Sequence, residues 1–301
     1  MRREFVRVRW GIFDDAGLQV AGDYGRKRGI MIPNKLKILW GEGRPVINGW
    51  LSIPCGFSAE VMAEQGYDSL TVDTQHGVID YPDAVAMLQA MRSSGVVPLA
   101  RVPWLEPGAI MKALDAGAYG VVCPMINNRK QAEELVSSCR YPPLGMRSFG
   151  PTRANISAGP GYASSANDEI ICLAMVETAE AIANIEEIVS TPGLDAIYVG
   201  PADLTLGIAN GRIPPGFDSE NEEVVSAIKM ILDAAKSAGI RAGLHCGSPE
   251  YAAMAVGWGF DLVTILNDAR ILAAGAKQSV VKFRELLGEE PGAAVERSSS
   301  Y

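Results

Sequence analysis

The sequence predicts an α/β protein built as a closed (β/α)8 TIM barrel. Strand-like apolar runs alternate with segments of helical periodicity from about Trp50 to Leu287, and eight such runs can be distinguished. Eight strands with helices between them favour parallel pairing and closure, with an open doubly wound sheet as the alternative. The 301 residues, 48% hydrophobic and 21% charged, suit a single domain with one large core.

The expected strands are short, apolar and often β-branched. They cover residues 47–53, 69–73, 97–101, 120–123, 170–176, 196–199, 240–244 and 261–265. Apolar residues at helical spacing predict helices over residues 58–65, 82–92, 107–116, 128–139 and 222–238. No Gly-x-Gly-x-x-Gly and no P-loop pattern follows any of these strands, which argues against a nucleotide-binding sheet.

The regular organisation begins at Met31, so we expect the barrel domain to span residues 31–288. Residues 1–30 are charged and poorly periodic, and we interpret them as a floppy arm or an extension from an upstream start codon. A protein that starts at Met31 should therefore fold and turn over like the full chain. Residues 289–301 carry Pro, Gly and a Ser run, which predicts a disordered tail.

The composition favours a cytoplasmic enzyme that acts on a small molecule. A net charge of −8 argues against nucleic acid and anionic membranes as partners, because both require a basic face. No apolar run approaches the ~20 residues of a membrane span, and the charged N-terminal segment lacks the apolar core of a signal peptide. The five cysteines are odd in number and widely spaced, so we interpret them as reduced core residues.

Four expected strands end on side chains that can do chemistry. Asp73 ends the second strand, with His76 three residues later, and Arg101 ends the third. Glu177 and Asp203 follow the fifth and sixth strands. Because the carboxyl ends of parallel barrel strands all point to one mouth, these side chains should converge on an active site.

The two carboxylates suit a divalent cation. Glu177 and Asp203 are one βα unit apart, so they should face the mouth from neighbouring strands. Mg²⁺ takes oxygen ligands and commonly keeps one or two carboxylates, several waters and oxygens of the substrate. The alternatives are that Glu177 is an acidic residue at a helix start and that Asp203 caps a helix.

His76 is the candidate acid or base. An imidazole beside a carboxylate has its tautomer fixed and its basicity raised, and Asp73 could be that carboxylate, although a lone loop histidine is often inert. Arg101 can bind a carboxylate or stabilise an enolate oxygen, with a salt bridge at the rim as the alternative. The second histidine, His245, also follows an apolar strand run and could line the mouth, but we interpret it as structural, because no residue near it in sequence gives it a partner.

The sequence offers no lysine in a position to form a Schiff base with a ketone substrate. Such a lysine would stand at a strand end inside the mouth, where desolvation lowers its pKa. The nine lysines instead precede the first strand or fall in expected helices: Lys27, Lys35, Lys37, Lys112, Lys130, Lys229, Lys236, Lys277 and Lys282.

Seven short motifs carry a family resemblance over about residues 49–287. They are Gly66-Tyr-Asp, Asp73-Thr-Gln-His-Gly77, Ala100-Arg-Val-Pro, Asp115-Ala-Gly-Ala, Arg140-Tyr-Pro-Pro-Leu-Gly-Met-Arg147, Val176-Glu177 and Gly200-Pro-Ala-Asp203. Together they make the chain similar to the HpcH/HpaI aldolases, metal-dependent class II pyruvate aldolases that include 4-hydroxy-2-oxoheptanedioate aldolase and 2-dehydro-3-deoxyglucarate aldolase. The resemblance implies an aldehyde-lyase that reversibly cleaves a 4-hydroxy-2-oxo acid into pyruvate, or a close 2-oxo acid, and an aldehyde.

The resemblance also implies roles for individual residues. Glu177 and Asp203 would bind Mg²⁺, Mn²⁺ or Co²⁺, His76 and Asp73 would form the acid/base dyad, and Arg101 would steady the enolate. The substrate-binding residues would be Gly200, Pro201, Ala202, Gln75 and Arg147, with Pro201 only shaping its loop because it has no N–H. The family is typically a homohexamer, a dimer of trimers with an exchanged final helix, here residues 267–287.

The chain departs from the family pattern in two places. Gln75 stands where many members have Glu, which removes a negative charge beside His76. Ser148 replaces the usual Gly, and the loop 149–167, which we expect to meet the aldehyde, looks short.

Two other functions stay open, namely a CoA-ester lyase of the citrate-lyase β type and a non-catalytic barrel that binds 2-oxo acids.

Overall fold

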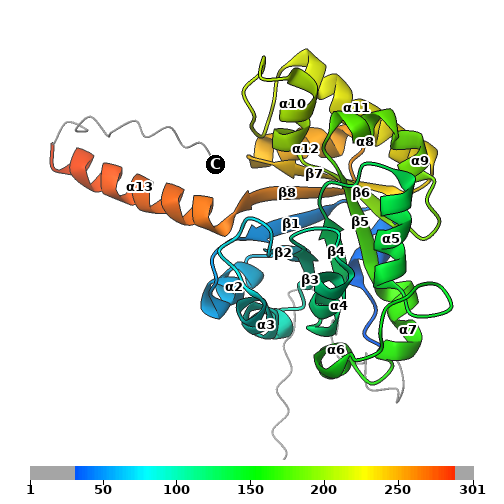
Figure 1. Ribbon diagram of the computed structural model, residues 1–301. Coiled ribbons are helices and arrows are strands. Elements are labelled where there is room, and N and C mark those ends of the chain that lie inside the picture. Colours follow the sequence, from blue (N-terminus) through cyan, green and yellow to red (C-terminus); the bar gives the residue numbers. More distant parts are fainter. Residues whose placement is uncertain (1–30, 289–301) are drawn as a thin grey trace, which may run out of the picture.

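The computed structural model describes residues 31–288 and forms the predicted closed barrel (Figure 1). Each strand pairs in parallel with the next, and the last pairs with the first. The predictions for residues 1–30 and 289–301 lie outside the described residues. The strands are β1 (Val46–Leu51), β2 (Ser69–Asp73), β3 (Val97–Arg101), β4 (Gly120–Cys123), β5 (Ile171–Val176), β6 (Ala196–Val199), β7 (Arg241–Cys246) and β8 (Leu262–Asn267).

Four strands have the bounds expected from the sequence, and the other four differ by one or two residues at one or both ends. The difference matters in β7, which extends to Cys246 and therefore includes His245. An apolar run marks where a strand is buried, but a polar side chain that faces the barrel interior interrupts the run without ending the strand.

Helices surround the barrel and carry the chain back to the start of the next strand. They are α1 (Lys35–Gly41), α2 (Gly56–Ala63), α3 (Tyr81–Ala90), a 3₁₀ turn (Met91–Ser93), α4 (Pro107–Asp115), α5 (Arg129–Cys139), α6 (Thr152–Ala158), α7 (Tyr162–Glu169), α8 (Ala179–Ala183), α9 (Ile185–Val189), α10 (Pro201–Ala209), α11 (Glu222–Ser237), α12 (Pro249–Trp258) and α13 (Asp268–Leu286). The five helices predicted from periodicity correspond to α2, α3, α4, α5 and α11.

The barrel interior contains polar side chains among its apolar ones. Asn48 of β1 donates to the Thr264 hydroxyl of β8 at 2.9 Å and accepts from the hydroxyls of Ser69 and Thr71 of β2. All four side chains are buried, so these hydrogen bonds offset their desolvation. The interior is therefore a packed and hydrogen-bonded core with its opening at the mouth.

The segment 149–167 is not the mouth loop that we expected. It forms most of α6 and α7, and its contacts lie at the amino-terminal ends of the strands: Tyr162 donates to the Leu114 carbonyl near the end of α4, and Asn167 bonds the backbone of Tyr141. The reason is topological, since a segment between the end of α5 and the start of β5 joins two points at that end. Within one chain it cannot meet a substrate at the mouth.

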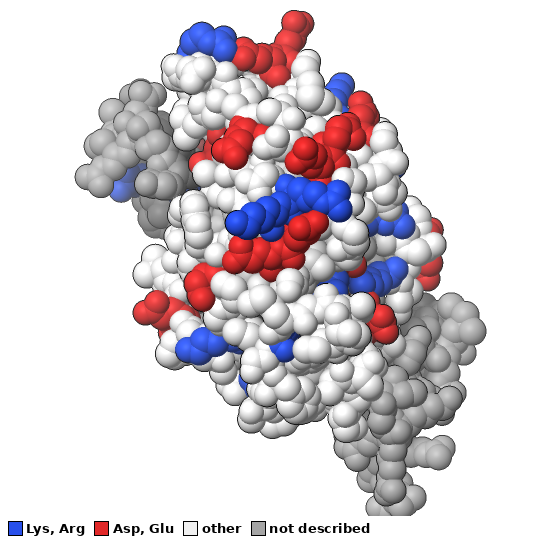
Figure 2. Space-filling view, turned by 45° about the vertical axis from the view of Figure 1, so that its right-hand side comes forward, with Lys and Arg blue, Asp and Glu red and all other residues white. Residues whose placement is uncertain are grey.

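The last helix, α13, leaves the barrel at the end of β8 and projects away from it (Figure 1). Of its residues only Asp268 is buried, while Leu272, Val280, Phe283 and Leu286 are exposed. On the face shown in Figure 2, basic and acidic side chains of the described residues alternate. Within residues 31–288, no helix is both long and apolar enough to span a bilayer.

Candidate active site at the carboxyl ends of the strands

Asp73 is the centre of a hydrogen-bonded cluster at the mouth. Its carboxylate accepts two bonds from Arg101, Nε at 2.9 Å and Nη2 at 2.6 Å, and one from the Trp50 indole N–H at 3.1 Å. Burial alone would raise the pKa of Asp73, but the bonds and the charge of Arg101, with help from Trp50 and the His76 N–H, lower it below its ordinary value. Asp73 is therefore an anion that holds Arg101 in place.

Arg101 is positioned from two sides. Its guanidinium lies 4.8 Å from the Trp50 ring centroid, and its fork is held by Asp73. The bonds to Asp73 use Nε and Nη2, so Nη1 makes no hydrogen bond with the described residues. A planar, permanently charged group fixed in this way can donate to an oxygen that gains negative charge.

His76 lies on the exposed loop that follows β2. Its backbone N–H donates to Asp73 Oδ1 at 3.2 Å, and that of Gln75 donates to the same oxygen at 3.1 Å. The loop turns back closely at Gly77, where a Cβ would collide with the Asp73 carbonyl. Among the described residues, the His76 imidazole has no hydrogen-bond partner, so Asp73 orients the loop through the backbone and not through the ring.

Glu177 is a buried carboxylate at the end of β5, only 2% exposed. It accepts the N–H of Met125 at 2.9 Å, and Met125 follows β4 with a left-handed φ of 56°, a costly conformation for a side-chain-bearing residue. Burial and the nearby Asp203 raise the pKa of Glu177 to about 7, against the lowering effects of Met125 and Arg101. The site thus places a carboxyl group where its charged form is poorly solvated.

Asp203 stands in the first turn of α10 and is exposed. Gly200 is the N-cap of this helix and Pro201 its first residue, so the following N–H groups point toward the mouth without helical partners. A Cβ at Gly200 would collide with Glu177 Oε2, so glycine is required for the two elements to meet. This turn can bind an anion beside the Glu177 carboxylate.

The two carboxylates fit a hard divalent cation. Burial and repulsion from Asp203 raise the pKa of Glu177, and a cation held by the two carboxylates would offset both effects. Oxygen ligands are those that Mg²⁺ and Mn²⁺ prefer. Among residues 31–288, no group of three or more His, Cys, Asp and Glu side chains could hold a metal ion. The remaining coordination positions would fall to water and substrate, as in other sites of this type.

The sequence did not reveal the aromatic wall of the mouth. His245 of β7 lies edge-on to Trp50 with centroids 4.8 Å apart, stacks on Phe217 at 4.7 Å, and contacts the Tyr198 hydroxyl through Nδ1 at 3.0 Å. Burial, then Arg101 and Arg270, lower the pKa of His245 to about 3 against the effect of Asp73, so the ring is neutral. The available signal was the alternation that directs Tyr198 and His245 inward on neighbouring strands.

Two predicted substrate residues lie in different surroundings. Gln75 is half-buried on the loop beside His76. Arg147 is far from the mouth: its side chain is fully buried, paired with Asp115 at 2.6 Å and held over the rings of Tyr141 and Tyr162. Asp115 ends α4 near the start of β4, so Arg147 stands at the amino-terminal ends of the strands.

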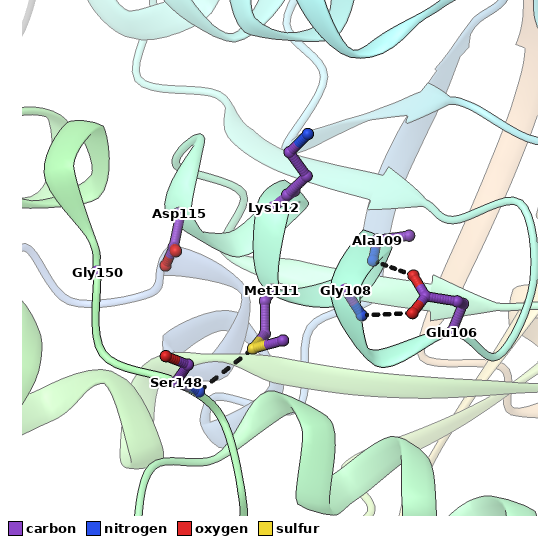
Figure 3. Close-up of a pocket in the computed structure, with 8 residues that line it drawn as sticks. All are labelled: Glu106, Gly108, Ala109, Met111, Lys112, Asp115, Ser148 and Gly150. Atoms are coloured by element: carbon purple, nitrogen blue, oxygen red, sulfur yellow. Dashed lines mark hydrogen bonds between the residues drawn. The ribbon is translucent and has the colours of Figure 1, made fainter.

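A separate hollow of about 560 Å³ lies on the outside of the barrel (Figure 3). It runs along α4 and the segment 148–150, and Ser148 donates its N–H to the Met111 sulfur across it. Glu106 at its edge caps α4 by accepting the N–H groups of Gly108 and Ala109. None of the predicted site residues lines this hollow, so the mouth is the better candidate for catalysis.

Comparison with known proteins finds relatives that belong to one family. A family profile described as HpcH/HpaI aldolase/citrate lyase matches residues 50–267. Hydroxypyruvate/pyruvate aldolase of Rhizorhabdus wittichii is 43% identical over 253 residues, which covers 84% of this chain and 100% of the relative. 4-Hydroxy-2-oxo-heptane-1,7-dioate aldolase of Klebsiella pneumoniae is 32% identical over 83% of this chain and 94% of its own.

A solved structure has the same fold. The crystal structure of an HpcH/HpaI aldolase/citrate lyase family protein from Burkholderia cenocepacia superposes with a TM-score of 0.76 at 31% identity. The superposition covers 83% of this chain and 99% of that chain. The similarity therefore extends over most of this chain and nearly all of that chain.

Proposed function

The chain belongs to the HpcH/HpaI aldolase/citrate lyase family, and we propose that it is a metal-dependent aldolase acting on 2-oxo acids. The reaction is the reversible cleavage of a 4-hydroxy-2-oxo acid to a 2-oxo acid and an aldehyde. The observation that carries the proposal is the position of Glu177, a buried carboxylate with its pKa raised to about 7 beside Asp203 and close to Arg101. Such a carboxylate needs a cation, and an enolate needs the same cation and the same arginine.

Each residue at the mouth has one task in cleavage. The substrate carboxylate would lie against the first turn of α10, where Ala202 and Asp203 have free N–H groups and Gly200 and Pro201 shape the approach. A divalent cation held by Glu177 and Asp203 would supply Lewis-acid polarisation of the 2-oxo group.

Proton transfer falls to His76. Its ring is exposed and unpaired among the described residues, so it can take the proton of the C4 hydroxyl directly or through water. The C3–C4 bond breaks, the aldehyde leaves, and the electron pair moves to the 2-oxo oxygen as an enolate. Nη1 of Arg101 donates to that oxygen, and a proton delivered to C3 then gives the 2-oxo acid.

We assign Asp73 the role of holding Arg101 and the His76 loop, because its carboxylate is used by Arg101, Trp50 and backbone N–H groups. Gln75 would line the approach beside His76. Arg147 receives no substrate contact within its own subunit, because it is buried at the other end of the barrel.

The relatives indicate the substrate class. Their names include hydroxypyruvate/pyruvate aldolase at 43% identity and 4-hydroxy-2-oxo-heptane-1,7-dioate aldolase at 32%. We propose pyruvate and hydroxypyruvate as the 2-oxo acids, Mg²⁺, Mn²⁺ or Co²⁺ as the cation, and the cytoplasm as the compartment.

A substrate screen tests this function. Pyruvate or hydroxypyruvate would be combined with a panel of aldehydes and each of the three cations, and aldol product would be measured. Product that requires a cation and survives borohydride added with pyruvate supports the proposal. A lysine adduct of pyruvate, or turnover limited to CoA thioesters, would replace it with a Schiff-base aldolase or a CoA-ester lyase. Binding of 2-oxo acids without turnover would indicate a sensor.

We further propose that α13 is exchanged between subunits of a hexamer built as a dimer of trimers. The support is its apolar face, formed by Leu272, Val280, Phe283 and Leu286, which the described residues of its own barrel leave exposed. Contiguous apolar surface of this kind marks protein interfaces. Phe283→Glu should reduce the assembly in light scattering, whereas Lys277→Glu, on the same helix but at a polar position, should leave it intact. An unchanged mass for Phe283→Glu would contradict the assignment.

A further inference from the structure

A line of hydrogen bonds crosses the barrel interior and ends on His245. Asn48 Nδ2 donates to Thr264 Oγ1 at 2.9 Å, Thr264 Oγ1 lies 2.6 Å from the Tyr198 hydroxyl, and that hydroxyl lies 3.0 Å from His245 Nδ1. Asn48 and Thr264 are fully buried and Tyr198 is 1% exposed. The line therefore has no exchange with solvent except at its mouth end.

The direction of the line determines where His245 carries its proton. Asn48 Oδ1 accepts from the hydroxyls of Ser69 and Thr71, so the amide orientation is fixed and Nδ2 is the donor to Thr264. Thr264 then donates to Tyr198, and Tyr198 donates to Nδ1. If instead His245 Nδ1 donated to Tyr198 and Tyr198 donated to Thr264, the hydroxyl proton of Thr264 would have no acceptor among the described residues. The favoured tautomer of His245 therefore has its proton on Nε2.

His245 Nε2 is free at the mouth. It makes no hydrogen bond with the described residues, and it is absent from their buried polar atoms that lack a partner. The His245 ring and the Arg101 guanidinium both lie against the Trp50 indole, each 4.8 Å from its ring centroid. A small molecule held by Arg101 therefore lies near the uncharged N–H of His245, beside the same indole.

We propose that His245 contacts the substrate, donating from Nε2 to a hydroxyl on carbon 3 of the 2-oxo acid, and that Tyr198 is its positioning residue. The inference rests on the proposed function and adds a preference for hydroxylated over unsubstituted 2-oxo acids. In the proposed function, the other oxygens of the substrate already have protein partners. The carboxylate and the 2-oxo oxygen face the α10 turn and Arg101, and the C4 hydroxyl faces His76. Carbon 3 is bonded to the 2-oxo carbon, so its hydroxyl is the remaining oxygen near Trp50.

The test compares two 2-oxo acids with one aldehyde in the full-length, cation-loaded protein. The quantity is kcat/KM for hydroxypyruvate divided by kcat/KM for pyruvate. His245→Phe keeps a ring but removes the donor, and the ratio should fall about five- to tenfold, the scale of one neutral hydrogen bond. His245→Gln places an amide N–H near the position of Nε2 and should retain most of the ratio. Tyr198→Phe should lower it.

A spectroscopic measurement on the wild-type protein adds a test that does not depend on how the variants fold. In ¹⁵N NMR of the wild-type protein, the His245 signals should be those of a neutral ring protonated on Nε2, and Tyr198→Phe should shift them toward the other tautomer. A wild-type ring protonated on Nδ1, or an unchanged ratio in His245→Phe, overturns the inference while the aldolase activity stands. A wild-type protein that turns over neither acid refutes the proposed function as well.

Discussion

At the amino-terminal ends of the strands, three aspartates repeat one arrangement, whereas Glu177 and Asp203 at the carboxyl ends lack it. Asp68, Asp195 and Asp261 each precede a strand and accept a backbone N–H from the strand before it, at 3.1, 2.9 and 2.9 Å. Each also pairs with Lys or Arg side chains. At the mouth, Glu177 and Asp203 have no basic partner at salt-bridge distance among the described residues.

The difference separates the carboxylates that stabilise the barrel from those that are available to bind a ligand. A carboxylate that receives a backbone N–H and a cationic side chain in the same chain stabilises the fold and has little capacity left for a ligand. A buried carboxylate without a cation costs free energy that is removed by a bound cation or by protonation. The contrast predicts large losses of activity from changes at the mouth and losses of stability alone at the other end.

The largest expected effect is on the metal site. Glu177→Gln and Asp203→Asn should each reduce aldol cleavage by about a thousandfold or more, because several kcal/mol of transition-state stabilisation depend on the cation. Excess chelator should do the same to the wild-type protein, reversibly. Steady-state kinetics measure the loss, and circular dichroism should show an unchanged fold. Full activity in chelator would refute the site.

The next effect concerns His76. His76→Ala should slow cleavage by about 10²- to 10⁴-fold, the usual contribution of a general acid or base. Proton exchange at C3 of pyruvate, which requires no aldehyde, should be less affected. Gln75→Glu offers a matched change on the same loop that keeps the imidazole. Cleavage by His76→Ala at the normal rate would show that another group moves the proton.

A third prediction uses the raised pKa of Glu177. In the unfolded chain this group titrates near 4.5, and in the folded metal-free protein near 7, so the folded state binds more protons between these values. The stability of the metal-free protein should fall as the pH rises through this window, by up to about 3 kcal/mol. Chemical denaturation of wild type and Glu177→Gln at pH 5 and 8 isolates the effect. Equal pH dependence of the two proteins would contradict it.

The smallest effect is expected at the opposite end of the barrel. Asp261→Asn weakens the contacts to Lys236, Arg241 and the β7 backbone, and should lower the free energy of unfolding by about 1–2 kcal/mol. Its kcat/KM should stay within about twofold of wild type, because the substitution is remote from the mouth. A large fall in activity without a fall in stability would contradict the assignment of stability to this end of the barrel and of activity to the mouth.

The sequence predicted the barrel well because strand and helix periodicity alternate without a gap, and it placed Arg101 and Glu177 at the mouth because strand ends share one face. It could not identify the partner of the His245 ring, because Tyr198 comes from a neighbouring strand and is not close in the chain. It also assigned Arg147 and the segment 149–167 to the substrate. Their place between a helix end and the next strand start puts them at the other end of the barrel.

The roles of single groups were the least predictable. Asp73 and His76 are three residues apart, which suggested a carboxylate–imidazole pair, yet the carboxylate is used by Arg101, Trp50 and the loop backbone. A side chain near another in sequence can be taken by a stronger donor from a different strand. Bidentate, charge-assisted bonding from Arg101 is stronger than a bond from a neutral imidazole.

The most direct test follows deuterium exchange into the methyl group of pyruvate by NMR, without any aldehyde, in wild type, Glu177→Gln and Asp261→Asn. This exchange reports formation of the enolate alone. We expect cation-dependent exchange in wild type and Asp261→Asn, its loss in excess chelator, and background exchange in Glu177→Gln. Exchange at the wild-type rate in chelator or in Glu177→Gln would contradict a cation site at the mouth as the origin of the enolate.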